Sequence, residues 1–119
     1  MKRGDIWTVS GGNDYAGKPR PVVIVQDDSF AETDSITVCG LTSDPTDAPL
    51  FRVRIEPSEM NGLKLGSCLM IDKLTTVNKT KLGKRIGHLE ERDLLRMNQS
   101  IIVFLGLATP TRMSSDSGD

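Results

Sequence analysis

The sequence predicts a mainly β protein with a C-terminal α-helix, arranged as a small β-barrel or strongly curved sheet that the helix plugs. Short apolar or alternating segments recur about every eight to twelve residues between turn signals, a spacing typical of small all-β domains. From about Glu90 to Leu107 the apolar residues fall at helical spacing instead. The 119 residues suffice for one domain with a sizeable core, assigned to residues 1–108.

The first half of the chain contains the candidate strands around a glycine-rich loop. Asp5–Val9 is the first strand, and residues 10–17 hold too much glycine for regular structure. The β-branched run Val22–Gln26 predicts a second strand buried on both faces. Ser35–Leu41 is the third strand. The sequence therefore places a long loop directly before a central strand.

The second half alternates strands with turns and then changes period. Further strands are predicted at 51–55, 67–73, 75–77 and 84–87, with a strong Asn-Gly turn at 61–62. Acidic residues in the first turn of the helix favour its dipole. Residues 109–119 are rich in Ser, Asp and Gly and are expected to form a disordered tail.

Composition narrows the function classes. The net charge of −1 argues mildly against generic nucleic-acid affinity, although the bases are clustered enough for a local basic surface. No apolar run reaches the roughly 18 residues of a membrane helix, and the N-terminus lacks a signal peptide's apolar region, so we expect a cytoplasmic protein. Cys39, Cys68 and the single His88 do not suffice for a disulfide framework or a metal site, and no cofactor motif is present.

The segment Lys18-Pro19-Arg20-Pro21 runs straight into the second strand. Each proline fixes its own φ and disfavours helix for the residue before it, so Arg20 lies on a stiff, extended backbone at the mouth of the loop. Its guanidinium is a permanently charged fork of donors that suits phosphate. Taken alone, an exposed arginine at a strand start is the simpler interpretation.

An ordered set of motifs resembles the MazF/PemK family, the ribosome-independent mRNA endoribonucleases of bacterial toxin–antitoxin pairs. The resemblance covers roughly residues 3–107 and rests on the segments 3–7, 18–25, 36–42, 67–73, 81–83 and 87–89.

The resemblance implies an SH3-like barrel assembled as a homodimer. It also implies an active-site pair that matches Arg20 and Thr42, and an antitoxin whose extended C-terminal segment covers the RNA groove. The implied cleavage of single-stranded RNA needs no metal or other cofactor, and it leaves a 2′,3′-cyclic phosphate and a 5′-hydroxyl.

The chemistry can also be argued from the residues. Attack by the substrate's own 2′-OH would spare DNA, and the enzyme must then neutralise the charge growing on phosphorus. Arg20 can do so by bidentate hydrogen bonding, while Thr42 can orient the phosphate or the 2′-OH. Neither is an obvious general base, so the proton-transfer roles stay open. Ser43 is a substitute hydroxyl at the same turn.

Further candidates for substrate binding are basic or aromatic. Tyr15 can stack on a base or pack on its own barrel. Four cations are candidates to line the phosphate path, each of which is otherwise an ordinary solvated side chain: Lys73, Lys79, Lys81 and Arg85. Lys18, next to Arg20, is a further candidate for substrate binding. His88 at the barrel-to-helix junction is expected to be structural, and Trp7 to be core.

Two other functions fit the same barrel. A CcdB-like toxin poisons gyrase by contact alone, but it uses apolar C-terminal residues, whereas this chain ends in polar residues 114–119. A catalytically silent RNA- or partner-binding barrel is the third interpretation. The RNA sequence that is read depends on loops 10–19, 43–50 and 57–66, whose conformation the sequence does not reveal.

Overall fold

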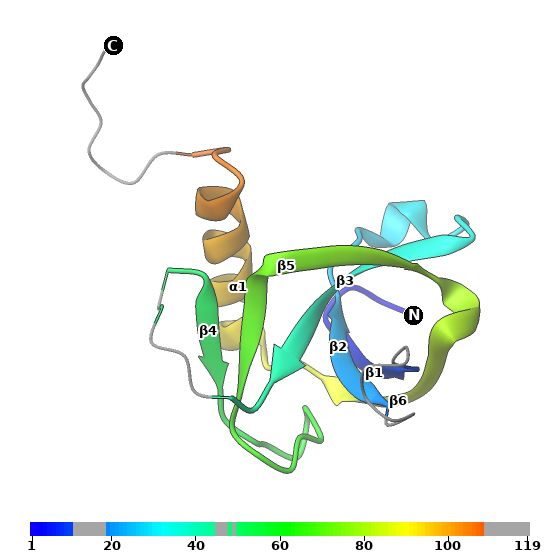
Figure 1. Cartoon of the computed structure of the whole chain (residues 1–119), viewed down its shortest axis with the longest axis horizontal. Coiled ribbons are helices and arrows are strands. Elements are labelled where there is room, and N and C mark those ends of the chain that lie inside the picture. Colours follow the sequence, from blue (N-terminus) through cyan, green and yellow to red (C-terminus); the bar gives the residue numbers. More distant parts are fainter. Residues whose placement is uncertain (11–18, 45–47, 49, 109–119) are drawn as a thin grey trace.

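A computed structural model of the protein describes residues 1–10, 19–44, 48 and 50–108 (Figure 1). The structure contains strands β1 (Asp5–Val9), β2 (Arg20–Ile24), β3 (Ser35–Thr42), β4 (Arg52–Ile55), β5 (Ser67–Asn78) and β6 (Leu82–His88), and helix α1 (Glu91–Phe104). Two short 3₁₀ helices, η2 (Asp28–Phe30) and η3 (Lys79–Lys81), complete the described elements. Most of the predicted glycine-rich loop and the predicted tail at 109–119 lie outside the described residues.

The six strands form one antiparallel sheet in the order β4-β5-β3-β2-β1-β6. The sheet curves strongly around the interior, with α1 standing beside β4 and the first half of β5 (Figure 1). The barrel-like prediction is therefore confirmed, although the described sheet stays open between its edge strands β4 and β6.

No helix in the described part of the chain is long and apolar enough to cross a membrane.

Apolar side chains pack on both faces of the central strands. Successive side chains of a strand point to opposite faces, so the continuous apolar run in β2 supplies both. Val23 belongs to the larger cluster, which includes Ile6, Leu69 and the α1 residue Met97. Its neighbours Val22 and Ile24 belong to a second cluster on the opposite face. The prediction of a strand buried on both faces is confirmed, although β2 begins at Arg20 and ends at Ile24.

In the second half of the chain several elements have other bounds than predicted, and strand β6 begins at Leu82, two residues earlier. The segments predicted as separate strands at 67–73 and 75–77 form the single strand β5, which pairs with β3 from Ser35 to Thr42. A register shift between Cys39 and Leu41 lets this long pair bend without breaking. Helix α1 ends earlier than predicted, at Phe104.

A Schellman motif ends α1. The N–H of Gly106 donates to the Val103 carbonyl, and that of Leu107 donates to the Ile102 carbonyl. Gly106 has a φ of +74°, which only glycine adopts without strain.

Candidate functional site

The strand register brings Arg20 and Thr42 together. In the β2–β3 pair Val22 lies opposite Gly40, and two residues further along each strand are Arg20 and Thr42. Both side chains line the same cavity of about 530 Å³. The first residue of β2 and the last of β3 therefore meet at one end of the sheet, as an active-site pair would require.

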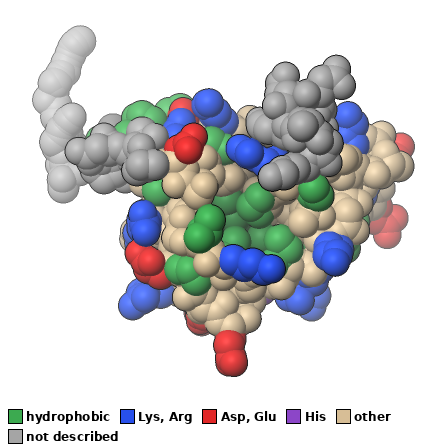
Figure 2. Space-filling view, turned by 60° about the horizontal axis from the view of Figure 1, so that its bottom comes forward, with side chains coloured by type: hydrophobic (Ala, Val, Ile, Leu, Met, Phe, Trp, Pro, Cys, Tyr) green, Lys and Arg blue, Asp and Glu red, His purple; other side chains and the backbone are tan. Residues whose placement is uncertain are grey.

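Apolar and polar side chains both line the cavity, and its rim is basic because three cations, Arg20, Lys64 and Lys84, outnumber the one carboxylate among the described lining residues. Strands β2, β3 and β6 and the loop before β5 supply its lining: Arg20, Pro21, Leu41, Thr42, Ser43, Asp44, Gly62, Leu63, Lys64, Leu65, Ser67, Lys84 and Ile86. Figure 2 shows apolar side chains gathered in the middle of one face, with Lys and Arg side chains around them. Such a site can hold an anionic ligand that also carries flat apolar surface.

Thr42 is held by a local turn. Its side chain is buried, and its Oγ1 accepts a hydrogen bond of 3.1 Å from the N–H of Asp44. Because that bond uses the oxygen as an acceptor, the hydroxyl proton is free to be donated to a ligand. Ser43, the predicted substitute hydroxyl, is exposed and lines the same cavity.

One wall of the cavity is the loop at 57–66, which the buried side chain of Asn61 organises. The Asn61 Oδ1 accepts from the N–H groups of Ser58 and Leu63, both at 2.9 Å. Its Nδ2 donates to the Glu56 carbonyl at 2.9 Å. Asn61 is fully buried, so these bonds form away from water and fix the loop's shape.

Two glycines let this loop lie directly on β6. Gly62 has a φ of +67°, and a Cβ there would lie 2.5 Å from the Ile86 carbonyl oxygen. A Cβ at Gly87 would collide with the Met60 carbonyl oxygen. The predicted Asn-Gly turn is confirmed, and the close backbone approach explains why glycine is needed here.

Strand β6 contributes Lys84, which the sequence did not single out. Relative to β1, β6 carries one extra residue on each side of Arg85, and the Lys84 N–H donates to Thr8 Oγ1 at 3.0 Å. Lys84 and Ile86 line the cavity. Residues two apart in a strand point to the same face, so this spacing could have indicated from the sequence that Lys84 and Ile86 lie together.

The other predicted cations lie elsewhere. Arg85 pairs with Asp5 at 3.3 Å, and Lys79 donates to the Ala31 carbonyl. Lys73 is exposed on β5, and none of these three lines the cavity. Tyr15 and Lys18 lie outside the described residues.

His88 belongs to a partly buried cluster around the buried carboxylate of Asp5, near the start of the chain. Its Nδ1 lies 3.0 Å from Asp5 Oδ1, and the Lys2 N–H donates to the same carboxylate. Burial opposes ionisation of Asp5, but the hydrogen bonds from His88 and Lys2 and the charge of Arg85 outweigh it and lower the Asp5 pKa. His88 does not line the cavity, which agrees with the structural role predicted for it.

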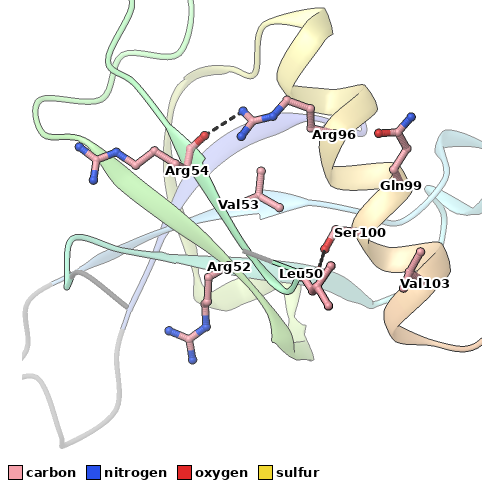
Figure 3. A pocket seen from close by; sticks show the side chains of 8 residues that line it. All are labelled: Leu50, Arg52, Val53, Arg54, Arg96, Gln99, Ser100 and Val103. Carbon is pink, nitrogen blue, oxygen red and sulfur yellow. Dashed lines mark hydrogen bonds between the residues drawn. The ribbon is translucent and has the colours of Figure 1, made fainter. Parts of the chain in front are cut away.

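A second cavity, of about 380 Å³, lies between β4 and α1 (Figure 3). Its arginines are engaged within the protein: Arg52 forms a two-point ion pair with Asp72, and Arg96 donates to the Arg54 carbonyl. The hydrogen bond from Arg52 lowers the pKa of Asp72. The two arginines of β4, Arg52 and Arg54, therefore contribute to this part of the fold rather than to the cavity at Arg20.

Burial also determines the state of the cysteines. Both Cys39 and Cys68 are buried and unpaired with each other. Burial raises the pKa of the Cys39 thiol to about 12, so the thiol stays protonated at neutral pH. Both cysteines are therefore small residues of the buried interior.

Comparisons with known proteins bear on the family and the fold. The family model for the PemK-like, MazF-like toxin of type II toxin–antitoxin systems matches residues 2–105. The "Probable endoribonuclease MazF" of Mycolicibacterium smegmatis is 52% identical over 91% of this chain and 99% of its own length. The "Endoribonuclease MazF" of Staphylococcus saprophyticus is 28% identical, over 92% of this chain and 94% of its own.

A solved structure with the same fold is an endoribonuclease in complex with its cognate antitoxin, from Mycobacterial species. It superposes with a TM-score of 0.77 and 22% identity, covering 92% of this chain and 99% of that one. At this identity the likeness concerns the fold alone.

Proposed function

Because this chain belongs to the family of PemK-like, MazF-like toxins of type II toxin–antitoxin systems, we propose that it cuts single-stranded mRNA as an endoribonuclease toxin, with Arg20 and Thr42 as its catalytic residues. The observation that carries the proposal is the meeting of these two side chains in one cavity with a basic rim. The proposed endoribonuclease domain spans residues 1–108, and its place of action is the cytoplasm, where mRNA and a cognate antitoxin would meet it.

The reaction uses the RNA's own 2′-OH as the nucleophile. As O2′ bonds to phosphorus, negative charge grows on the phosphoryl oxygens and the bond to O5′ breaks, giving a 2′,3′-cyclic phosphate and a 5′-hydroxyl. Arg20 stabilises that charge, and Thr42, whose oxygen accepts from the Asp44 N–H, donates its hydroxyl proton in a hydrogen bond to a phosphate oxygen. No metal takes part in the proposed reaction, and the groups that move the protons are not assigned.

The partners are proposed from the surface and from the related structure. The C-terminal half of α1 and the residues after it expose Ile102, Val103, Phe104, Leu105 and Leu107. A second copy of the chain would cover this apolar surface in a homodimer. The related endoribonuclease was solved with its cognate antitoxin. By analogy, a cognate antitoxin would place an acidic C-terminal segment over the basic rim of the cavity here.

Cleavage of a long single-stranded RNA in the presence of EDTA, with mapping of the 5′ ends, tests the proposal. The wild type should make discrete cuts that carry 5′-hydroxyls. Arg20→Ala should lower the rate by about 10²- to 10³-fold, as removal of one charge-stabilising donor does elsewhere. The matched control is Arg92→Ala, an exposed arginine of α1 that does not line the cavity and should cut normally.

Two results would contradict the proposal. If the folded wild type cut none of several RNAs of diverse sequence, the barrel would instead act by contact, as a gyrase-binding toxin does. If Arg20→Ala kept most of the wild-type rate, the assignment of the catalytic pair would be wrong even though the protein is a nuclease.

A further inference from the structure

Asp44 is the one carboxylate among the described residues that line the cavity, where it lies with the cations Arg20, Lys64 and Lys84. A carboxylate repels phosphate, so the backbone of a bound RNA gives it no favourable contact. An ionised carboxylate only accepts hydrogen bonds, so the part of a ligand that binds Asp44 must donate them.

The backbone of Asp44 is fixed, while its side chain remains available. The Asp44 N–H donates to Thr42 Oγ1 at 3.1 Å, which ties the residue to the proposed reaction centre. The residue is exposed, and within the described part of the chain no hydrogen bond or ion pair occupies its carboxylate. Its two acceptor oxygens are therefore open to a ligand in the cavity that Asp44 lines.

Single-stranded RNA offers donors on the edges of its bases. Proteins read such bases through hydrogen bonds to their Watson–Crick edges while the flat faces lie on side chains. Guanine presents two neighbouring donors, N1–H and N2–H, which match the two oxygens of a carboxylate. Adenine and cytosine each present an amino donor next to an acceptor nitrogen, and uracil presents one imino donor between two carbonyls.

The surroundings of Asp44 suit the face of a base. Leu63 and Leu65 from the loop at 57–66 line the same cavity, and Leu65 is 65% exposed. The buried bonds of Asn61 hold this loop in place, so the aliphatic surface is formed before the ligand arrives. A base lying on these leucines would present its edge to the rim of the cavity.

We propose that Asp44 is a specificity-determining residue, which accepts hydrogen bonds from the Watson–Crick edge of a base beside the scissile phosphate and favours guanine there. The inference rests on the proposed function, because it takes RNA as the ligand of the cavity. It extends that function by naming the group that reads a base, separately from Arg20 and Thr42, which act on the phosphate.

The test compares wild type with Asp44→Asn on a set of RNAs that differ only in the base on either side of the cut. The amide keeps one acceptor and gains a donor, so it matches adenine or cytosine better than guanine. The ratio of kcat/KM for guanine over adenine should fall by about ten- to hundredfold, the range for loss of a bidentate base contact. Glu59→Gln is the matched control, because Glu59 is an exposed carboxylate of the neighbouring loop that does not line the cavity.

A binding measurement separates this inference from the proposed nuclease activity. Oligonucleotides with a 2′-deoxy ribose at the cut site cannot be cleaved, so their affinity reports base reading alone. Tighter binding of the guanine oligonucleotide by the wild type, lost in Asp44→Asn and in Asp44→Ala, supports the inference whether or not RNA is cut.

Two outcomes would overturn it. One is an unchanged order of base preference in Asp44→Asn. The other is an equal loss of kcat on all sequences together with loss of the acidic limb of the pH–rate profile, which would make Asp44 a general base instead.

Discussion

Replacing Asn61 with alanine tests whether buried hydrogen bonds hold the cavity wall. The change removes the acceptor of the Ser58 and Leu63 N–H groups and the donor to the Glu56 carbonyl. Each such bond contributes about 0.5–1.5 kcal/mol net, and more when its partner is left buried without one. The expected loss is therefore about 3 kcal/mol, a large part of the roughly 5–15 kcal/mol that stabilises an ordinary domain.

Urea unfolding measures this loss, followed by the fluorescence of Trp7, the single tryptophan of the chain. The matched control is Asn78→Ala, which removes one bond, from the Thr80 N–H, at the exposed start of η3. That variant should lose about 1 kcal/mol or less. The argument fails if Asn61→Ala is no less stable than Asn78→Ala. Folded Asn61→Ala at low temperature should also show a raised KM for RNA, because its leucine-bearing wall is no longer fixed.

Three further predictions concern other parts of the molecule. Gly62→Ala should destabilise the fold by more than the roughly 1 kcal/mol expected for Gly106→Ala in thermal unfolding. Both glycines have positive φ, but only Gly62 meets backbone within 4 Å, so equal losses would refute the close-approach argument. Because the Asp5 pKa lies below its unfolded value, its contribution to stability is present above about pH 4 and is lost as the pH falls through the folded pKa. Asp5→Asn should thus lose less Tm than wild type between about pH 4 and 2, and parallel curves would contradict this. Val103→Asp should weaken the proposed homodimer at least about tenfold in sedimentation, and a dimer of unchanged affinity would exclude the α1 surface as its contact.

Strand patterns predicted most of the fold because each strand buries at least one face. The β-branched run Val22–Gln26 predicted a strand buried on both faces, and the change of period near Glu90 located α1. Proposing a break near Leu74 was wrong, since β3 pairs with β5 on both sides of that residue. The exposed half of β5 lacks the apolar alternation that would have marked it as one strand.

The cavity was predictable only in part. The resemblance indicated Arg20 and Thr42, and the register of β2 and β3 brings them together. Choosing Arg85 rather than Lys84 as a lining cation depended on the register of β6, where a shift of one residue exchanges the faces of a strand. That register is set by two extra residues in β6, each of which forms a bulge against β1. A bulge depends on how the two strands pair, and a single sequence does not show that pairing.

The wall and the rim of the cavity should respond differently to mutation. The wall depends on directional contacts: the bonds of Asn61 and the glycine backbones that touch β6, with Leu65 itself left exposed. Changes there alter stability and substrate binding together. Asp44 and Lys84 are exposed, so substitution costs little folding energy and changes ligand contacts directly. Variants that lose affinity in proportion to stability therefore report on the wall, whereas variants that change base preference at full stability report on the surface that reads RNA.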